Sequence, residues 1–245
     1  MSLTGRICLI VGGRRGIGGA ITTALGDAGA TVLATSREAK DGEFWSVDVT
    51  DQASVSGVGA RLEAAYGRLD VLVYNSGIPG PTAALQDVTE DQWAETLDVN
   101  LTGAYRMCRA TLPWLACSSS GRIILIASMT GRRPLLHRVP YAASKAALIG
   151  FSRSLALEVG PKGITVNTIS PGYVMGERID AVIEKQAAAR GLTVEQARHE
   201  VVALSPLERM VRPESVAYLV TMLASPLSQD ITGADFNVTA GVWMD

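Results

Sequence analysis

The sequence is poor in histidine and cysteine, and this scarcity narrows the chemistry that it can support. Its 245 residues include two histidines, His137 and His199, which so placed do not make a metal-ligand set. The cysteines, Cys8, Cys108 and Cys117, are widely spaced and include no C-x-x-C pair. We therefore expect no metal site and no disulfide framework, and a reducing compartment.

An excess of basic residues and long apolar runs are also missing. Lysine and arginine number 22 against 24 acidic residues, and a net charge of −2 argues against a dominant role in binding nucleic acid. No window reaches the roughly 18 apolar residues that a spanning helix needs. The N-terminal MSLTGR leads directly into ICLIVGG, which is too short for a secretory segment. We expect a cytoplasmic protein that binds neither nucleic acid nor membrane.

Short apolar, β-branched runs instead alternate with helical patterns along the whole chain, and this alternation is typical of an α/β protein. Strands are expected at 7–11, 31–35, 44–47, 69–74, 122–127, 164–169 and 235–238. Helices are expected at 17–29, 52–66, from about 89, at 101–115 and at 141–159. Apolar strands that are each followed by a helix predict one domain, residues 1–245, with a doubly wound parallel sheet covered on both faces.

Two segments depart from this alternation. The sequence SREAKDGE, residues 36–43, is too short and polar for a crossover helix, so that helix should be missing or reduced to a turn. Residues 176–213 form a long helical insertion that includes ERIDAVIEKQAAAR and VEQARHEVVAL. Because it follows the carboxyl end of the sixth strand, where open α/β sheets bind ligands, it is either a substrate lid or a packing element.

A glycine-rich turn, GGRRGIG, follows the first expected strand. Its Gly12, Gly16 and Gly18 would let backbone N–H groups approach a pyrophosphate at the start of a helix. The spacing is G-x-x-x-G-x-G, and such turns also occur merely to tighten a strand–helix junction. Its place after the first strand favours dinucleotide binding.

The end of the second strand bears on which dinucleotide is bound. A carboxylate there would accept hydrogen bonds from the ribose hydroxyls and repel a 2′-phosphate, but Ser36 and Arg37 stand there instead. Arg15, in the glycine turn, could converge with Arg37 on one phosphate. This favours NADP(H). The alternative is that Arg37 is a solvated loop charge and Glu38 binds the ribose.

Tyr141 and Lys145, in YAASKAAL, form a candidate acid/base pair. They are four residues apart, so they lie on one face of a helix, and Ser128 closes the apolar run RIILIAS thirteen residues before the tyrosine. A nearby cation lowers the pKa of a phenol, and the serine hydroxyl could hold a carbonyl oxygen. Alone, Y-x-x-x-K also occurs by chance on helix surfaces.

With these motifs in order, the sequence resembles the classical short-chain dehydrogenase/reductase family over essentially its whole length. It looks most like the branch of 3-oxoacyl-carrier-protein reductases and related carbonyl reductases. Further matches are VDVTD, YNSG, LDVNLTG and VNTISPGYV. The resemblance implies a Rossmann-type fold and a homotetramer or homodimer built through the helices at 101–115 and 141–159. The simpler explanation of those broadly apolar helices is burial within one chain.

The resemblance also implies a role for each site residue. Tyr141 would exchange a proton with the substrate oxygen, Lys145 would lower its pKa and bind the nicotinamide ribose, and Ser128 would position the oxygen. Asn100 would support a water that relays protons to Lys145. The expected cofactor contacts are Gly12, Arg14, Arg15, Gly16, Ile17, Gly18, Ser36, Arg37, Asp48, Val49, Asn75, Gly77, Tyr141, Lys145, Pro171, Gly172 and Val174.

Several positions depart from the family pattern. Tyr74 replaces the first asparagine of N-N-A-G and so costs a hydrogen bond that steadies the central sheet in the family. Gly176 stands where the family has a threonine that contacts the nicotinamide amide, and Thr239-Ala240-Gly241 replaces D-G-G. None removes a catalytic group, but with the insertion they leave the substrate class open.

The loop between Ser128 and Tyr141 is basic, with Arg132, Arg133, His137 and Arg138. Such a loop could attract an anionic substrate or a phosphopantetheine arm, or it could be solvated.

Three functions are compatible with these observations. The first is an NADP(H)-dependent ketoreductase that interconverts a ketone and a secondary alcohol. The second is an NAD-dependent alcohol dehydrogenase of a cyclic or hydroxylated catabolic substrate. The third is a non-catalytic dinucleotide-binding module.

Overall fold

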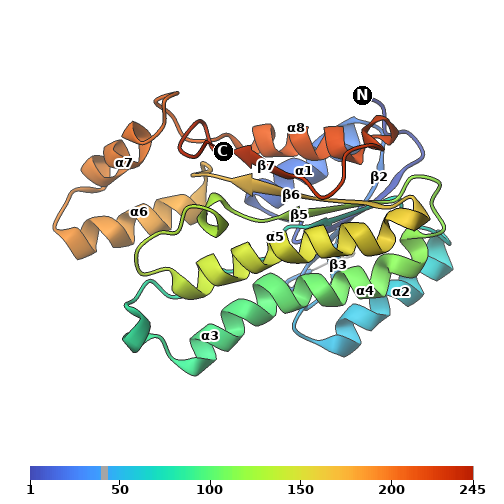
Figure 1. The fold of residues 1–245 in the computed structure, drawn as a ribbon, viewed down its shortest axis with the longest axis horizontal. Coiled ribbons are helices and arrows are strands. Elements are labelled where there is room, and N and C mark those ends of the chain that lie inside the picture. The colour runs from blue at the N-terminus through green and yellow to red at the C-terminus, as the bar shows by residue number, and fades with distance from the viewer. Residues whose placement is uncertain (40–43, 245) are drawn as a thin grey trace.

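A computed structural model of the chain, which describes residues 1–39 and 44–244, contains a parallel sheet at its centre (Figure 1). The order of its seven described strands is β3-β2-β1-β4-β5-β6-β7. The strands are β1 (Ile7–Val11), β2 (Thr31–Ser36), β3 (Trp45–Ser46), β4 (Val71–Tyr74), β5 (Arg122–Ile126), β6 (Thr165–Pro171) and β7 (Asp235–Val238). Since every pairing is parallel, all strands end at the same edge of the sheet.

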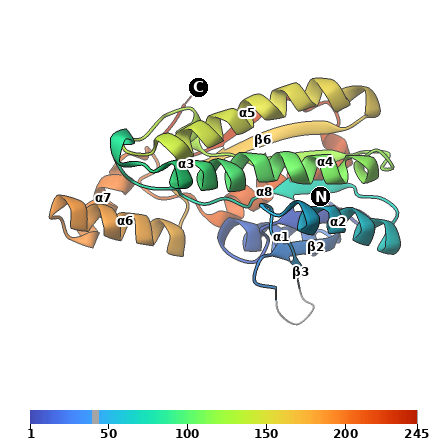
Figure 2. The same ribbon diagram turned by 90° about the horizontal axis from the view of Figure 1, so that it is seen from below.

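Helices cover both faces of this sheet, as Figures 1 and 2 show. On one face lie α1 (Gly16–Asp27) and α8 (Pro213–Ala224), and on the other lie α2 (Gln52–Ala65), α4 (Gly103–Leu115) and α5 (Val139–Val159). Each face has its own buried cluster: Ile10, Ile21 and Val220 belong to the first, Leu72 and Met107 to the second. The continuously apolar strands are therefore buried from both sides, as their sequence predicts.

A π-helical turn, Asp98–Thr102, joins α3 (Glu90–Leu97) to α4. The N–H of Gly103 donates to the carbonyl of Asp98, five residues back. The hydroxyl of Tyr74, at the end of β4, donates to the carbonyl of Val99 at 2.5 Å. Because Tyr74 is fully buried, this bond ties the sheet to the irregular turn. The tyrosine that departs from the family pattern thus supplies a hydrogen bond of its own.

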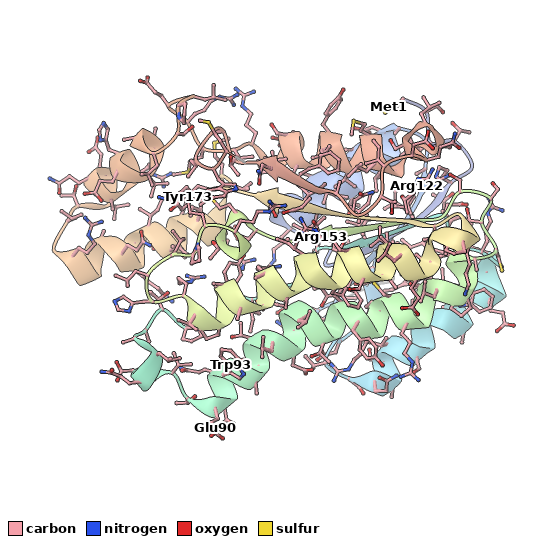
Figure 3. The ribbon with its side chains drawn as sticks, in the orientation of Figure 1. Met1, Glu90, Trp93, Arg122, Arg153 and Tyr173 are labelled. Carbon is pink, nitrogen blue, oxygen red and sulfur yellow. The ribbon has the colours of Figure 1, made fainter. Side chains whose placement is uncertain are left out.

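The insertion consists of two helices, α6 (Glu177–Arg190) and α7 (Val194–Ala203), which extend beyond the sheet in Figure 1. They enclose a separate small core that includes Ile183 and Val201, with Tyr173 packed against it. Figure 3 shows Tyr173 at the base of α6, far from Arg122 at the opposite end of the sheet. A parallel bridge between Val174 and Val211 closes the base of the insertion.

The predicted fold class is confirmed, with small differences in where elements begin and end. Strand β3 is shorter than expected, α5 begins two residues before Tyr141, and the expected helix at 101–115 begins with the π turn. Residues 36–39 form no helix, while 40–43 of the short connection lie outside the described residues. Helix α8 was not predicted, although Pro213 at its first turn and its apolar residues Val216 and Val220 are usual signals. No described helix is long and apolar enough to cross a bilayer.

We expect Tyr74→Phe to lower the free energy of unfolding by about 1–2 kcal/mol, because it removes a buried hydrogen bond to the π turn. Urea or guanidinium unfolding measures this change. Tyr218→Phe is the matched control, since Tyr218 is 67% exposed on α8 and should unfold at the wild-type midpoint. Equal midpoints for the two variants would show that the Tyr74 hydroxyl contributes nothing.

Candidate active site

A cleft of about 1080 Å³ opens at the carboxyl edge of the sheet, between the strand ends and the insertion. Nearly all of the predicted site residues line it. They are Gly12, Arg14, Arg15, Gly16, Ile17, Ser36, Arg37, Asp48, Val49, Asn75, Gly77, Ser128, Tyr141, Lys145, Pro171, Gly172 and Val174. Two predicted residues do not line the cleft, Gly18 and Asn100, and both lie behind its wall.

The glycine turn after β1 forms a cradle into which side chains would not fit. Gly12 has a φ of +82°, and a Cβ at Gly18 would overlap the carbonyl oxygen of Gly12. The Nδ2 of Asn75 donates to that same carbonyl at 2.8 Å and holds the turn against β4. Arg15, the N-cap of α1, makes no side-chain cap bond to the first-turn N–H groups. These backbone donors at a helix start fit the pyrophosphate of a dinucleotide.

Basic side chains surround the far end of the cleft, beyond the end of β2. Arg14 pairs with Glu38 at 3.4 Å and also donates to the Glu38 carbonyl at 3.1 Å. Arg15 and Arg37 are exposed and form no ion pair within the part of the chain that the structure describes. Hydrogen bonds from Thr50 lower the pKa of Asp48, with a smaller contribution from the charge of Arg37.

Tyr141 and Lys145 point into the middle of the cleft from the first turns of α5. Lys145 is 4% exposed, and its Nζ donates to the carbonyl of Ile126 at the end of β5 at 2.9 Å. Ser128 follows the same strand and lines the same cleft, and its hydroxyl helps to lower the pKa of the Tyr141 phenol. The helix spacing and the strand end thus bring the three predicted groups together.

The surroundings of Tyr141 shift its pKa. Burial alone would raise the pKa of this phenol, but the cations Lys145 and Arg178, the Ser128 hydrogen bond and Arg138 together lower it. Burial also lowers the pKa of Lys145, and the Tyr141 phenolate opposes that change. A half-buried tyrosine with a lowered pKa beside a buried lysine is suited to exchanging a proton with a bound molecule.

Asn100 is fully buried in the π turn, behind the tyrosine and lysine. Its Oδ1 accepts from the N–H of Ile78 at 2.8 Å, and its Nδ2 donates to the carbonyl of Ile78 and to Ser144 Oγ, both at 3.0 Å. Ser144 in turn donates to the carbonyl of Tyr141 at 2.8 Å. Asn100 therefore connects the loop after β4 to the helix that holds the acid/base pair.

The segment after β6 forms the wall opposite Tyr141. The N–H of Gly172 donates to the carbonyl of Val238 at 3.0 Å, and a Cβ at Gly172 would lie 2.9 Å from the Cα of Thr239. The pairing of β6 with β7 ends at Pro171 and Val238. After Val174, which bridges to Val211, the chain enters the insertion.

The basic loop between Ser128 and Tyr141 divides into two parts. Arg132 pairs with the buried carboxylate of Asp235 at 2.6 Å. Burial raises the pKa of Tyr173, and the nearby Arg133 opposes this change. His137 is exposed, whereas Arg138 lines the cleft. Arg178, from the first turn of α6, was not predicted as a site residue but lies 5.9 Å from the Tyr141 ring centre. Only the folded insertion brings it there, so no local pattern could have indicated it.

Metal ligands do not cluster in this cleft. Within residues 1–39 and 44–244, no three histidine, cysteine, aspartate or glutamate side chains are grouped to hold a metal ion.

Known proteins match the chain over nearly its full length. A family model described as enoyl-(acyl carrier protein) reductase matches residues 11–243. The 3-oxoacyl-[acyl-carrier-protein] reductase of Vibrio harveyi is 33% identical, with 100% of each chain covered. A variant of actinorhodin polyketide ketoreductase, solved with NADPH, is 30% identical with a TM-score of 0.90, and 99% of each chain is covered.

An NAD⁺-bound xylitol dehydrogenase is 26% identical with a TM-score of 0.91, covering 98% of this chain and all of the other. Solved neighbours therefore include proteins bound to either nicotinamide dinucleotide. With a glycine cradle, a Ser–Tyr–Lys arrangement and full-length relatives, the chain belongs to the short-chain dehydrogenase/reductase family, oxidoreductases that act on CH–OH and C=O groups with NAD(P).

Proposed function

We propose that the protein is an NADP(H)-dependent ketoreductase that interconverts a ketone and a secondary alcohol. The observation that supports this most directly is the half-buried Tyr141 phenol, with its lowered pKa, beside Ser128 and Lys145 in a cleft that also contains a dinucleotide cradle. A reductase with NADPH among the solved relatives is consistent with it.

The cleft residues divide the reaction between them. The cleft residues from Gly12 to Ile17, Lys145 and the segment 171–174 would hold a nicotinamide dinucleotide, which would supply the hydride, with its two electrons, in reduction and accept it in oxidation. The Tyr141 hydroxyl gives its proton to the carbonyl oxygen, so the C=O becomes CH–OH and the phenol becomes phenolate. Ser128 donates a hydrogen bond to the same oxygen, and Lys145 stabilises the phenolate. Asn100 positions this helix and supports the water through which the phenolate regains a proton.

Tyr141→Phe tests this assignment. It removes the proton donor but little volume, so turnover of a generic ketone should fall by about 10²–10⁴-fold while dinucleotide binding changes little. Ketone-dependent oxidation of NADPH measures the first quantity, and titration of protein fluorescence with NADPH the second. Tyr218→Phe should keep wild-type turnover. Undiminished turnover in Tyr141→Phe would refute the assignment, and a wild-type protein inactive on every ketone would favour a non-catalytic binding module.

The lowered pKa of Tyr141 predicts opposite pH dependence in the two directions. Alcohol oxidation needs the phenolate and should rise with pH, whereas ketone reduction needs the phenol and should fall. Both limbs should lie below the ordinary tyrosine value of about 10. Measuring kcat/KM against pH in each direction, with saturating cofactor, checks this. Limbs of the same sign, or limbs at or above pH 10, would contradict it.

Arg15 in the glycine turn and Arg37 after β2 support NADP(H) over NAD(H). Arg15 and Arg37 are on the rim of the cleft without ion pairs among the described residues, so their donors are available to a ribose 2′-phosphate. Glu38, the alternative ribose ligand, is already paired with Arg14. The NAD-dependent alternative retains one argument, because Glu38 is 72% exposed at its side chain and could exchange this weak partner for a ribose.

We expect the wild-type protein to have a lower KM for NADPH than for NADH. Arg37→Gln should raise the KM for NADPH about tenfold and leave that for NADH nearly unchanged, because only the former has the 2′-phosphate. Arg209→Gln, an exposed position outside the cleft, is the charge-matched control. A wild-type preference for NADH would instead support the NAD-dependent dehydrogenase.

Three further features belong to the proposal. Residues 176–213 act as a lid, because their two helices have a core of their own and meet the rest of the chain through a narrow base. A homotetramer or homodimer forms through the α4 and α5 faces, where Tyr105 and Leu157 are exposed. Three free cysteines fit a reducing compartment such as the cytoplasm.

A further inference from the structure

Two arginines lie beside Tyr141, and neither is among the expected cofactor contacts or proton donors. The Arg138 guanidinium carbon lies 5.0 Å from the Tyr141 ring centre, and that of Arg178 lies 5.9 Å from it. They come from different segments: Arg138 directly precedes α5, and Arg178 is in the first turn of the insertion. Both line the cleft.

Neither arginine is paired with a carboxylate in the described part of the chain. Arg138 donates to the Pro79 carbonyl at 2.8 Å and to Thr82 Oγ1 at 3.2 Å, and Arg178 donates to the Gly77 carbonyl at 3.4 Å. These partners are neutral. The Arg138 Nε is buried and has no hydrogen-bond partner. The two guanidinium groups therefore both lie near Tyr141, and they retain N–H groups that could donate to a ligand.

Their mutual charge is unfavourable in the absence of an anion. Burial lowers the pKa of Arg138, the Tyr141 phenolate opposes this, and the charge of Arg178 lowers it further. Lowering the pKa of Tyr141 does not by itself require both arginines, since Lys145 is already beside the phenol. The arrangement is the one that a carboxylate would complete, because two guanidinium groups can bind its two oxygens.

Apolar residues line the cleft together with this pair. Leu135 and Leu136 from the loop, and Ile179 and Val182 from α6, present apolar side chains to the same cleft. They suit the carbon chain of a substrate, whereas the charges that act on Tyr141, among the described cleft residues, are those of Lys145 and the two arginines.

We infer, on the basis of the proposed function, that the substrate is a short keto acid, or the corresponding hydroxy acid, whose carboxylate lies between Arg138 and Arg178. The carboxylate is one or two carbons from the carbonyl, because both guanidinium groups are within 6 Å of the ring that protonates the oxygen. The phosphate of a phosphopantetheine arm is separated from its acyl group by the whole arm, so it would not reach this pair. In the reaction the ketone gains the hydride and the Tyr141 proton, and the carboxylate is unchanged.

Matched acids and esters test this inference. Acetoacetate with ethyl acetoacetate, and pyruvate with methyl pyruvate, differ in the negative charge but share the ketone. For at least one pair, the wild-type kcat/KM should be about tenfold or more higher for the acid. Arg138→Gln and Arg178→Gln should each reduce the acid-to-ester ratio by about tenfold, whereas Arg209→Gln should leave it unchanged. Taking the ratio removes any effect of these arginines on the pKa of Tyr141, which both members of a pair share.

The outcomes separate this inference from the proposed function. Turnover of the esters with no preference for either acid, or with a preference that neither arginine variant reduces, overturns the inference alone. Turnover of a carrier-bound 3-oxoacyl thioester far above both acids also overturns it and leaves the ketoreductase intact. No turnover of any ketone by folded wild-type protein, with either dinucleotide, overturns the proposed function and the inference together.

Discussion

The burial of the Lys145 ammonium is the constraint on which the site depends. A cation removed from water needs compensation, yet Lys145 has a backbone carbonyl and a phenol beside it and, among the described residues, no carboxylate at hydrogen-bond distance. The Ile126 carbonyl satisfies one of its donors, and phenolate formation on Tyr141 supplies the missing negative charge. The negative charge of the Tyr141 phenolate thus balances the positive charge of the buried Lys145 ammonium. The strand end, the helix and the π turn keep these groups at fixed positions.

The π turn is where the central sheet and the acid/base helix are joined. Asn100 uses its amide to hold the loop after β4 and Ser144 of α5 at once. Tyr74 fastens the same turn from the sheet side through the Val99 carbonyl. An irregular helix next to a reactive group is a recurrent feature of functional sites. Here the π turn is held by the Tyr74 hydroxyl, and Tyr74 is one of the positions at which this chain differs from the family pattern.

The sequence predicted the sheet, most helices and the meeting of Ser128, Tyr141 and Lys145 in one cleft, because the information for these features is local. A β-branched run gives a strand, a four-residue spacing gives one helix face, and a glycine turn after a first strand gives a cradle. Arg178 could not be predicted in this way, since it reaches Tyr141 through the placement of a whole inserted segment. The partner of Arg132 was equally hidden, because Asp235 lies more than one hundred residues away in sequence. Ion pairs between residues far apart in the chain leave no periodic pattern in a single sequence, so they cannot be predicted from it.

The bridge between Val174 and Val211 brings the two ends of the insertion together beside the sheet. Backbone bonds from Met175 to Val211 and from Val211 to Tyr173 reinforce it. A segment that leaves and returns at one point can lengthen, shorten or be exchanged in evolution without moving the strands that hold Ser128 and Tyr141. The inserted helices and the strands of the sheet are in this sense parts of the chain that can change separately. The two valines are therefore the natural junctions for exchanging the insertion while keeping the sheet.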